Sequence, residues 1–433
     1  MKYFLMLVVG VLFSFYYFPI SFKILPILNT KMILAVFGVI LLVYNLFCSR
    51  FKGDIPRYII VIFAYAFAVS LIAFFSTVYN NTPDYVYATY FISMTVWLSA
   101  AYALGELVYR LHGKLSLSIV TNYLIAVCAF QCIMALVLDA APAIKAFINT
   151  YIEHNQDFLD KSNVRRLYGI GAALDTAGIR FSIVLILITH KIASFKGRWE
   201  LLSYSLYWLL FIFIAIVGNM MARTTTVGML LAIAYLLLYP LCHSYTFMQT
   251  SNNFGSIWKS LGVIMLVVIP VVMILFAENP NFSSKMRFGF EGFFNLVETG
   301  EWNVGSNNQL MNMLVFPDTI KTWIIGDGYF NNPNDINPQF YLGEITGGYY
   351  MGTDIGYLRF IFYFGILGLS VFTMFFMKLT QLCNRLLMNE RPLFIFIFIL
   401  GMCVWLKVST DIFVIFALFL IIASKDSASE RVC

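Results

Sequence analysis

Long apolar segments fill most of this chain and constrain its fold more than any other feature. Crossing about 30 Å of hydrocarbon takes ~20 helical residues, and ten segments near that length occur, at 3–21, 31–48, 58–79, 86–105, 116–139, 179–195, 201–219, 224–242, 258–277 and 355–378. An eleventh, 393–423, is interrupted between Lys407 and Asp411 and is expected to form a hairpin of two short or tilted helices. Of the 433 residues, 61% are hydrophobic and 12% charged, which excludes a soluble domain. The sequence predicts an all-α polytopic membrane protein with about twelve (11–12) transmembrane helices.

Basic residues in the short connections predict its orientation. They fall on alternate connections, as Arg50, Lys52 and Arg57, then Arg110 and Lys114, then Lys191, Lys196 and Arg198, then Lys378, Arg385 and Arg391. The positive-inside rule makes these connections cytoplasmic, and both termini with them. The net charge of +6 is spread over these connections, so no nucleic-acid partner is expected. Residues 1–433 are expected to form a single integral membrane domain.

Two long polar connections, 140–178 and 278–354, then lie on the far face of the membrane. Pro142 is expected to open an amphipathic helix in the first. Its apolar face comprises Ile144, Phe147, Ile148, Tyr151 and Ile152. In the second, Ser283 and Ser284 are expected to cap a helix. That helix carries Phe290, Phe293, Phe294 and Val297 on one side. Both are expected to lie on the outer membrane surface.

Charged side chains gather at the outer ends of the spans. They are Arg180, Arg223, Arg359, Lys407 and Asp411, with Arg165, Arg166 and Arg287 in the long loops. Long basic side chains can snorkel to the interface, and Lys407 and Asp411 could neutralise each other at i,i+4. Snorkelling, however, predicts basic residues mainly on the cytoplasmic side. Guanidinium groups grip phosphate oxygens with paired donors, so converging arginines indicate a lipid-linked diphosphate.

Four segments, in their order along the chain, carry a family resemblance. They are "RLYGIGAALDTAG" (166–178), "MARTTTVG" (221–228), "IIGDGYF" (324–330) and "TDIGYLRFIFYFGILG" (353–368). With the two long loops, this pattern resembles bacterial O-antigen polymerases, also called oligosaccharide repeat unit polymerases. The resemblance implies a GT-C-like glycosyltransferase of the bacterial inner (cytoplasmic) membrane, with both long loops periplasmic.

The implied reaction joins undecaprenyl-diphosphate-linked oligosaccharide units. The growing chain moves onto the incoming unit and undecaprenyl diphosphate is released, yielding an O-antigen or capsule-type polysaccharide. Membrane lipid, a chain-length regulator and a flippase of the same pathway are the other partners expected. The related O-antigen ligases, which transfer glycan to lipid A core, usually carry a histidine where Thr353 and Asp354 stand here, and 278–354 contains none. A lipid-linked glycan flippase or transporter is a further alternative, although such proteins tend to show internal repeats.

Site roles follow from this chemistry. Asp354 is the expected base for the acceptor hydroxyl, with Arg223 and Arg359 as the other catalytic candidates. Arg165, Arg166, Arg180 and Arg287 are expected to bind the diphosphate, and Asp327 and Glu344 are secondary carboxylate candidates. Asp354 could instead cap the following helix or pair with Arg359, and Asp327 could serve a Gly-Asp-Gly turn. The four histidines show no metal-ligand spacing, so neither metal nor cofactor is expected.

Overall fold

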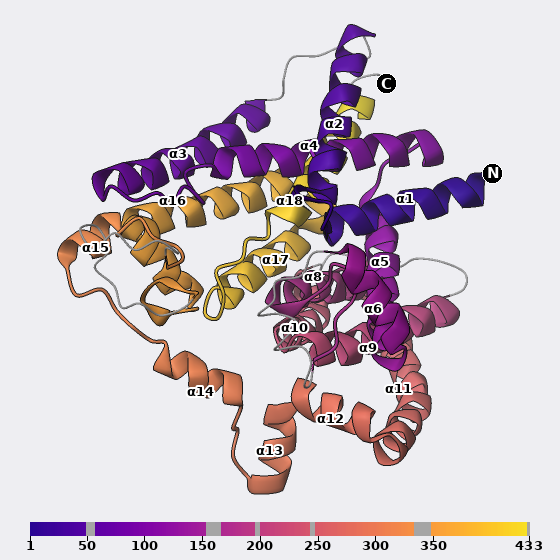
Figure 1. The fold of residues 1–433 in the computed structure, drawn as a ribbon. Coiled ribbons are helices and arrows are strands. Elements are labelled where there is room, and N and C mark those ends of the chain that lie inside the picture. The colour runs from indigo at the N-terminus through magenta and orange to yellow at the C-terminus, as the bar shows by residue number, and fades with distance from the viewer. Residues whose placement is uncertain (49–56, 153–165, 195–199, 243–246, 333–347, 431–433) are drawn as a thin grey trace.

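The computed structural model describes residues 1–48, 57–152, 166–194, 200–242, 247–332 and 348–430 (Figure 1). The first half holds α1 (Lys2–Tyr17), β1 (Ser21–Phe22), β2 (Leu25–Asn29), α2 (Thr30–Phe47), α3 (Arg57–Tyr79), α4 (Tyr90–His112), α5 (Leu117–Ala140), α6 (Pro142–Tyr151), α8 (Leu174–Ser194) and α9 (Glu200–Met221). The second half holds α10 (Thr225–Cys242), α11 (Phe247–Glu278), α12 (Pro280–Gly289), α13 (Glu291–Thr299), α14 (Gly305–Asn312), α15 (Ile320–Ile325), a 3₁₀ turn at Tyr350–Gly352, α16 (Gly356–Leu386), another at Met388–Glu390, α17 (Arg391–Val404) and α18 (Phe413–Glu430). The strands form one short antiparallel pair, and the predicted all-α class is confirmed.

Eight helices in the described ranges are long and apolar enough to cross a membrane, namely α2, α3, α4, α5, α8, α9, α11 and α16. Four shorter apolar helices, α1, α10, α17 and α18, accompany them. A helix satisfies its backbone hydrogen bonds internally, which is what allows an apolar segment to enter hydrocarbon. Each apolar segment identified in the sequence falls on one of these helices, except that 393–423 falls on two. The prediction of a polytopic membrane protein is supported.

The last apolar segment is divided as expected. Helix α17 ends at Val404 and α18 begins at Phe413. Between them, the indole N–H of Trp405 donates to the carbonyl of Thr410 at 2.8 Å, which closes the connection. The hairpin therefore places Lys407 and its neighbours in a loop instead of inside one long helix.

Helix α16 runs further than the predicted 355–378 and is kinked at Gly365, where φ is +69°. A Cβ at this position would lie 2.0 Å from the carbonyl oxygen of Ile324 in α15. Only glycine combines this backbone conformation with so close an approach. The kink therefore docks α15, a part of the second long connection, against a predicted span.

The amphipathic helix of the first long connection is confirmed as α6, which has Pro142 in its first turn. The prediction for the second connection is wrong in two respects. The cap is Asn279, whose side chain accepts a hydrogen bond from the amide of Phe282 at 3.1 Å, so Ser283 and Ser284 lie inside α12. The aromatic face is also split, because the chain leaves helical geometry at Phe290 and restarts as α13.

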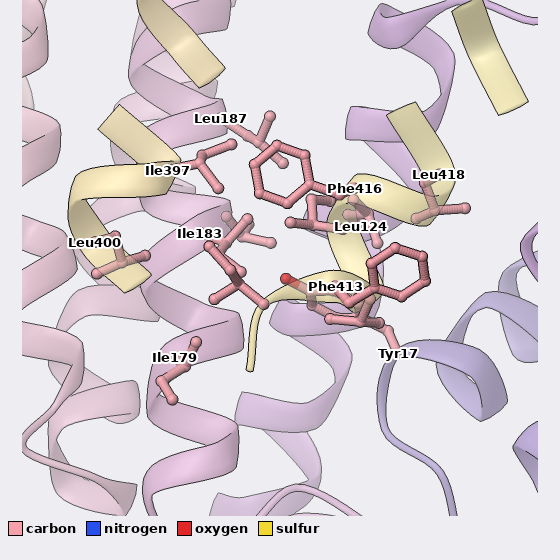
Figure 2. Packing of buried hydrophobic residues seen from close by; sticks show 14 of the residues in the cluster. Tyr17, Leu124, Ile179, Ile183, Leu187, Ile397, Leu400, Phe413, Phe416 and Leu418 are labelled. Carbon is pink, nitrogen blue, oxygen red and sulfur yellow. The ribbon is translucent and has the colours of Figure 1, made fainter. Parts of the chain in front are cut away.

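Helix α8 lies at the centre of the core, and 83% of its most apolar stretch is buried. Figure 2 shows Ile179, Ile183 and Leu187 following one another along this helix and facing α17 and α18. Their partners include Ile397, Leu400 and Phe416. Such burial on nearly all sides holds the start of α8 in a fixed position, and the charged residues described next lie at that end.

Candidate functional site

Three segments far apart in sequence meet at Asp175, in the first turn of α8. Its carboxylate pairs with the ammonium of Lys407 at 3.0 Å, from the α17–α18 connection. It also accepts a hydrogen bond from the hydroxyl of Thr224, between α9 and α10. The preceding residue, Leu174, has φ of +52°, which is unusual for a branched side chain and strains the backbone by ~1–3 kcal/mol. The surrounding contacts therefore hold Asp175 in place at a local energetic cost.

Arg359, one turn inside α16, organises a second group. Its side chain is only 7% exposed and lies 3.6 Å from the carboxylate of Asp354. The guanidinium donates to Ser409 Oγ at 2.9 Å, to the Phe330 carbonyl at 3.0 Å and to Asn331 Oδ1 at 2.8 Å. It also stacks against the Phe330 ring at 3.7 Å and the Tyr349 ring at 4.5 Å. Arg359 thus joins the second long connection to the α17–α18 connection.

Asp354 lies in the loop before α16 and does not cap that helix, whose N-cap residue is Ile355 with no side-chain cap bond. The pairing with Arg359 is the alternative that the structure contains. Burial raises the pKa of the Asp354 carboxyl to about 6; Arg359 lowers it in part, and the negative charge of Asp175 raises it further. A carboxyl with this pKa can both take up and release a proton near neutral pH.

Arg166 and Arg223 both lie against the ring of Phe288 in α12. Their guanidinium carbons are 4.9 Å and 4.2 Å from the centre of its ring. Arg223 pairs with Glu291 at 2.7 Å and donates to the Phe288 carbonyl at 2.9 Å and to Ser306 Oγ at 3.0 Å. For Arg166, by contrast, no carboxylate within 4 Å is found in the described ranges. Arg166 therefore has no direct ion pair among the described residues, although its charge acts on Asp175.

Arg180 is the second such cation. It lies five residues beyond Asp175 on α8, with its guanidinium carbon 5.9 Å from the Tyr17 ring and 5.5 Å from the Phe18 ring. Its electrostatic neighbours include Asp411, but no ion pair to its side chain occurs among the described residues. Lys407 pairs with Asp175, so the self-neutralising pair of Lys407 and Asp411 suggested by their spacing is not formed.

These groups are within electrostatic reach of one another. The charges of Asp175 and Lys407 act on Asp354, and that of Arg166 acts on Asp175. The structure therefore brings together four of the residues singled out in the sequence: Arg166, Arg223, Asp354 and Arg359. We call this set, with Asp175 and Lys407, the charged cluster. Arg180 lies further along α8, where its charge interacts with that of Asp411.

Other expected site residues lie elsewhere. Arg287 pairs with Glu298 at 2.8 Å and stacks on Phe294, so its described contacts are with α11 and α13 and not with the charged cluster. Asp327 accepts hydrogen bonds from Lys321 at 2.6 Å and from the Thr322 hydroxyl at 2.8 Å. These contacts hold the turn between Gly326 and Gly328, the alternative suggested by its motif. Arg165 and Glu344 lie outside the described residues.

The sequence analysis did not single out Asp175, although it lies in "RLYGIGAALDTAG". The sequence marks Asp175 only as an acidic residue in the first turn of an apolar helix. Carboxylates are common at this position because they interact favourably with the helix dipole, so the position alone does not indicate a functional site. Within the described ranges, no group of three or more histidine, cysteine or acidic residues could hold a metal ion. The side chains of the charged cluster are guanidinium, ammonium and carboxylate groups.

Comparison with known proteins adds no further assignment. The chain matches no protein-family model, no curated protein and no solved structure.

Proposed function

We propose that this chain is a membrane glycosyltransferase that polymerises lipid-linked oligosaccharide units. The observation that carries the proposal is the presence of Arg166 and Arg180, two guanidinium groups without a carboxylate partner in the described ranges, at one end of a bundle of apolar helices. Cations that lack a directly paired carboxylate are costly beside hydrocarbon unless an anion joins them. A diphosphate attached to a lipid tail supplies both the anion and the apolar part.

The proposed reaction uses these residues as follows. The acceptor hydroxyl of the incoming unit attacks the anomeric carbon of the growing chain, and the bond from that carbon to the diphosphate oxygen breaks. Asp354 takes the hydroxyl proton, a role supported by its pKa of about 6. Arg166, Arg180 and Arg223 stabilise the negative charge that develops on the departing diphosphate. Arg359 positions Asp354 and the loop before α16.

The proposal also includes the membrane topology and location of the chain. We assign about twelve spans, a GT-C-like architecture, cytoplasmic termini and the bacterial inner membrane, with the charged cluster facing the periplasm. The support is the number of apolar helices and the alternation of basic residues along the chain. Undecaprenyl diphosphate is the expected lipid, and transfer to lipid A core is the competing outcome.

The first test is an electrophoretic profile of surface glycan from a strain lacking the gene. Lipid cores carrying one repeat unit, with no ladder above them, are expected. Bare cores together with long lipid-linked chains in the membrane would instead identify a ligase. An unchanged ladder would refute both.

Complementation then tests the cluster with a matched pair of variants. Arg166→Ala removes the cation beside Phe288 and is expected to abolish the ladder. Arg287→Ala removes a neighbouring arginine that has its own acidic partner, Glu298, and is expected to leave the ladder intact. Equal ladders from both variants, at equal protein levels, would contradict the role given to Arg166.

A further inference from the structure

An apolar cavity of about 380 Å³ lies between α9, α10 and α11. Its walls include Phe211 and Ile212 from α9, Met229 from α10, and Val268 and Met273 from α11. Every lining side chain is apolar, and the indole N–H of Trp208 is already bonded to the carbonyl of Ile257 at 3.2 Å. Pockets for polar ligands carry a few placed polar groups. This cavity therefore suits a hydrocarbon chain.

The cavity runs along α11 toward the charged cluster. Its α11 lining extends from Trp258 to Met273, a rise of about 22 Å at 1.5 Å per helical residue. Phe290 completes the lining and lies two residues after Phe288, so the two are at most about 7 Å apart along the backbone. Phe288 is the ring that both Arg166 and Arg223 contact. A chain in the cavity thus has its head within reach of these guanidinium groups.

The charge at this end favours a diphosphate headgroup. Glu291 neutralises Arg223 through the 2.7 Å ion pair, whereas Arg166 has no such partner in the described ranges. A bound diphosphate satisfies Arg166 and competes with Glu291 for Arg223, and it carries more negative charge than the single phosphate of an ordinary phospholipid. Helix α11 contributes little else to the core, since 6% of its most apolar stretch is buried.

We propose that the cavity between α9, α10 and α11 is the subsite for the polyprenyl tail of the lipid-diphosphate substrate, with the diphosphate on Arg166 and Arg223. This inference rests on the proposed function and adds where the lipid is held. The α12–α13 corner, fixed by the bond from Arg223 to the Phe288 carbonyl, couples the tail subsite to the head subsite.

The test is photo-crosslinking of the full chain in nanodiscs. The probe is a photoreactive polyprenyl diphosphate without sugar, with the reactive group in its tail, and a phosphatidylglycerol probe with the same group is the comparison. Labelled peptides are expected from 200–242 and 247–278 with the diphosphate probe and not with phosphatidylglycerol. Equal labelling by both probes would mean that the cavity holds bulk lipid, and labelling only elsewhere would overturn the proposal.

Variants supply the matched control. Val268→Trp and Ile212→Trp fill the cavity from α11 and α9 and are expected to lower specific labelling about tenfold, the effect of losing roughly two buried methylene contacts. Leu266→Trp adds the same ring to an α11 residue that is 78% exposed and outside the cavity lining, and is expected to label like the parent. Parental labelling of both cavity variants would overturn the proposal.

The two proposals fail separately. If the gene deletion leaves the glycan ladder unchanged while the diphosphate probe still labels the cavity, the enzyme assignment is wrong and the lipid subsite stands. If the deletion removes the ladder while labelling avoids the cavity, the enzyme assignment stands and the tail subsite is wrong. The labelled-peptide map of the unmodified protein decides the second case even if a tryptophan variant does not fold.

Discussion

Replacing Asp354 by asparagine is expected to change how the stability of the protein depends on pH. Burial raises the pKa of this carboxyl from 3.8 to about 6 in the folded state. Between these values, the folded protein binds more protons than the unfolded chain, so the free energy of unfolding falls as pH rises. Two pKa units correspond to about 3 kcal/mol, which partial exposure of the side chain reduces to about 2 kcal/mol.

The measurement compares melting temperatures of the purified parent and Asp354→Asn from pH 4 to pH 7. Many carboxylates titrate over this range in both proteins, so the difference between the two curves isolates Asp354. The parent is expected to lose about 2 kcal/mol relative to the variant as pH rises through the window. Parallel curves would refute the reasoning, because they would mean that the carboxyl has the same pKa in both states.

Three further predictions concern other contacts, and each is measured by the melting temperature of the purified variants. Lys407→Met removes the partner of Asp175 and is expected to cost about 1–3 kcal/mol, and adding Asp175→Asn should recover part of the loss. Gly365→Ala should cost more than about 2 kcal/mol because of its positive φ and the adjacent carbonyl, whereas Gly262→Ala, whose added methyl meets open space, should not destabilise. Arg180→Met should change stability by less than about 1 kcal/mol yet abolish the glycan ladder.

The positions of the apolar helices could be read from the sequence because hydropathy is a local property. A long apolar segment forms a helix in lipid wherever its neighbours lie, and the segments from 3–21 to 393–423 all fall on helices. The break at Lys407 to Asp411 was visible for the same reason. Helix ends were harder to predict from the sequence. Ser283 and Asn279 are both favourable N-cap residues and lie four positions apart, and the structure uses Asn279.

The partners of the charges could not be read from the sequence. The spacing of Lys407 and Asp411 indicated a pair, but the chain between α17 and α18 is not helical there, and Lys407 meets Asp175, 232 residues away. Arg223 and Arg287 looked alike as loop or helix-end cations. One lies against Phe288 and Glu291, whereas the other faces Glu298 on α13.

Sequence alone therefore determined that this chain forms apolar helices, where most of them lie, and that arginines crowd one end of them. Tertiary structure decided which arginines are neutralised and which remain available, and it raised the pKa of Asp354 to about 6. The physical reason is that burial and ion pairing depend on which helix ends meet. The contacts between helix ends depend on the packing of the core around α8, which cannot be read from a local sequence pattern.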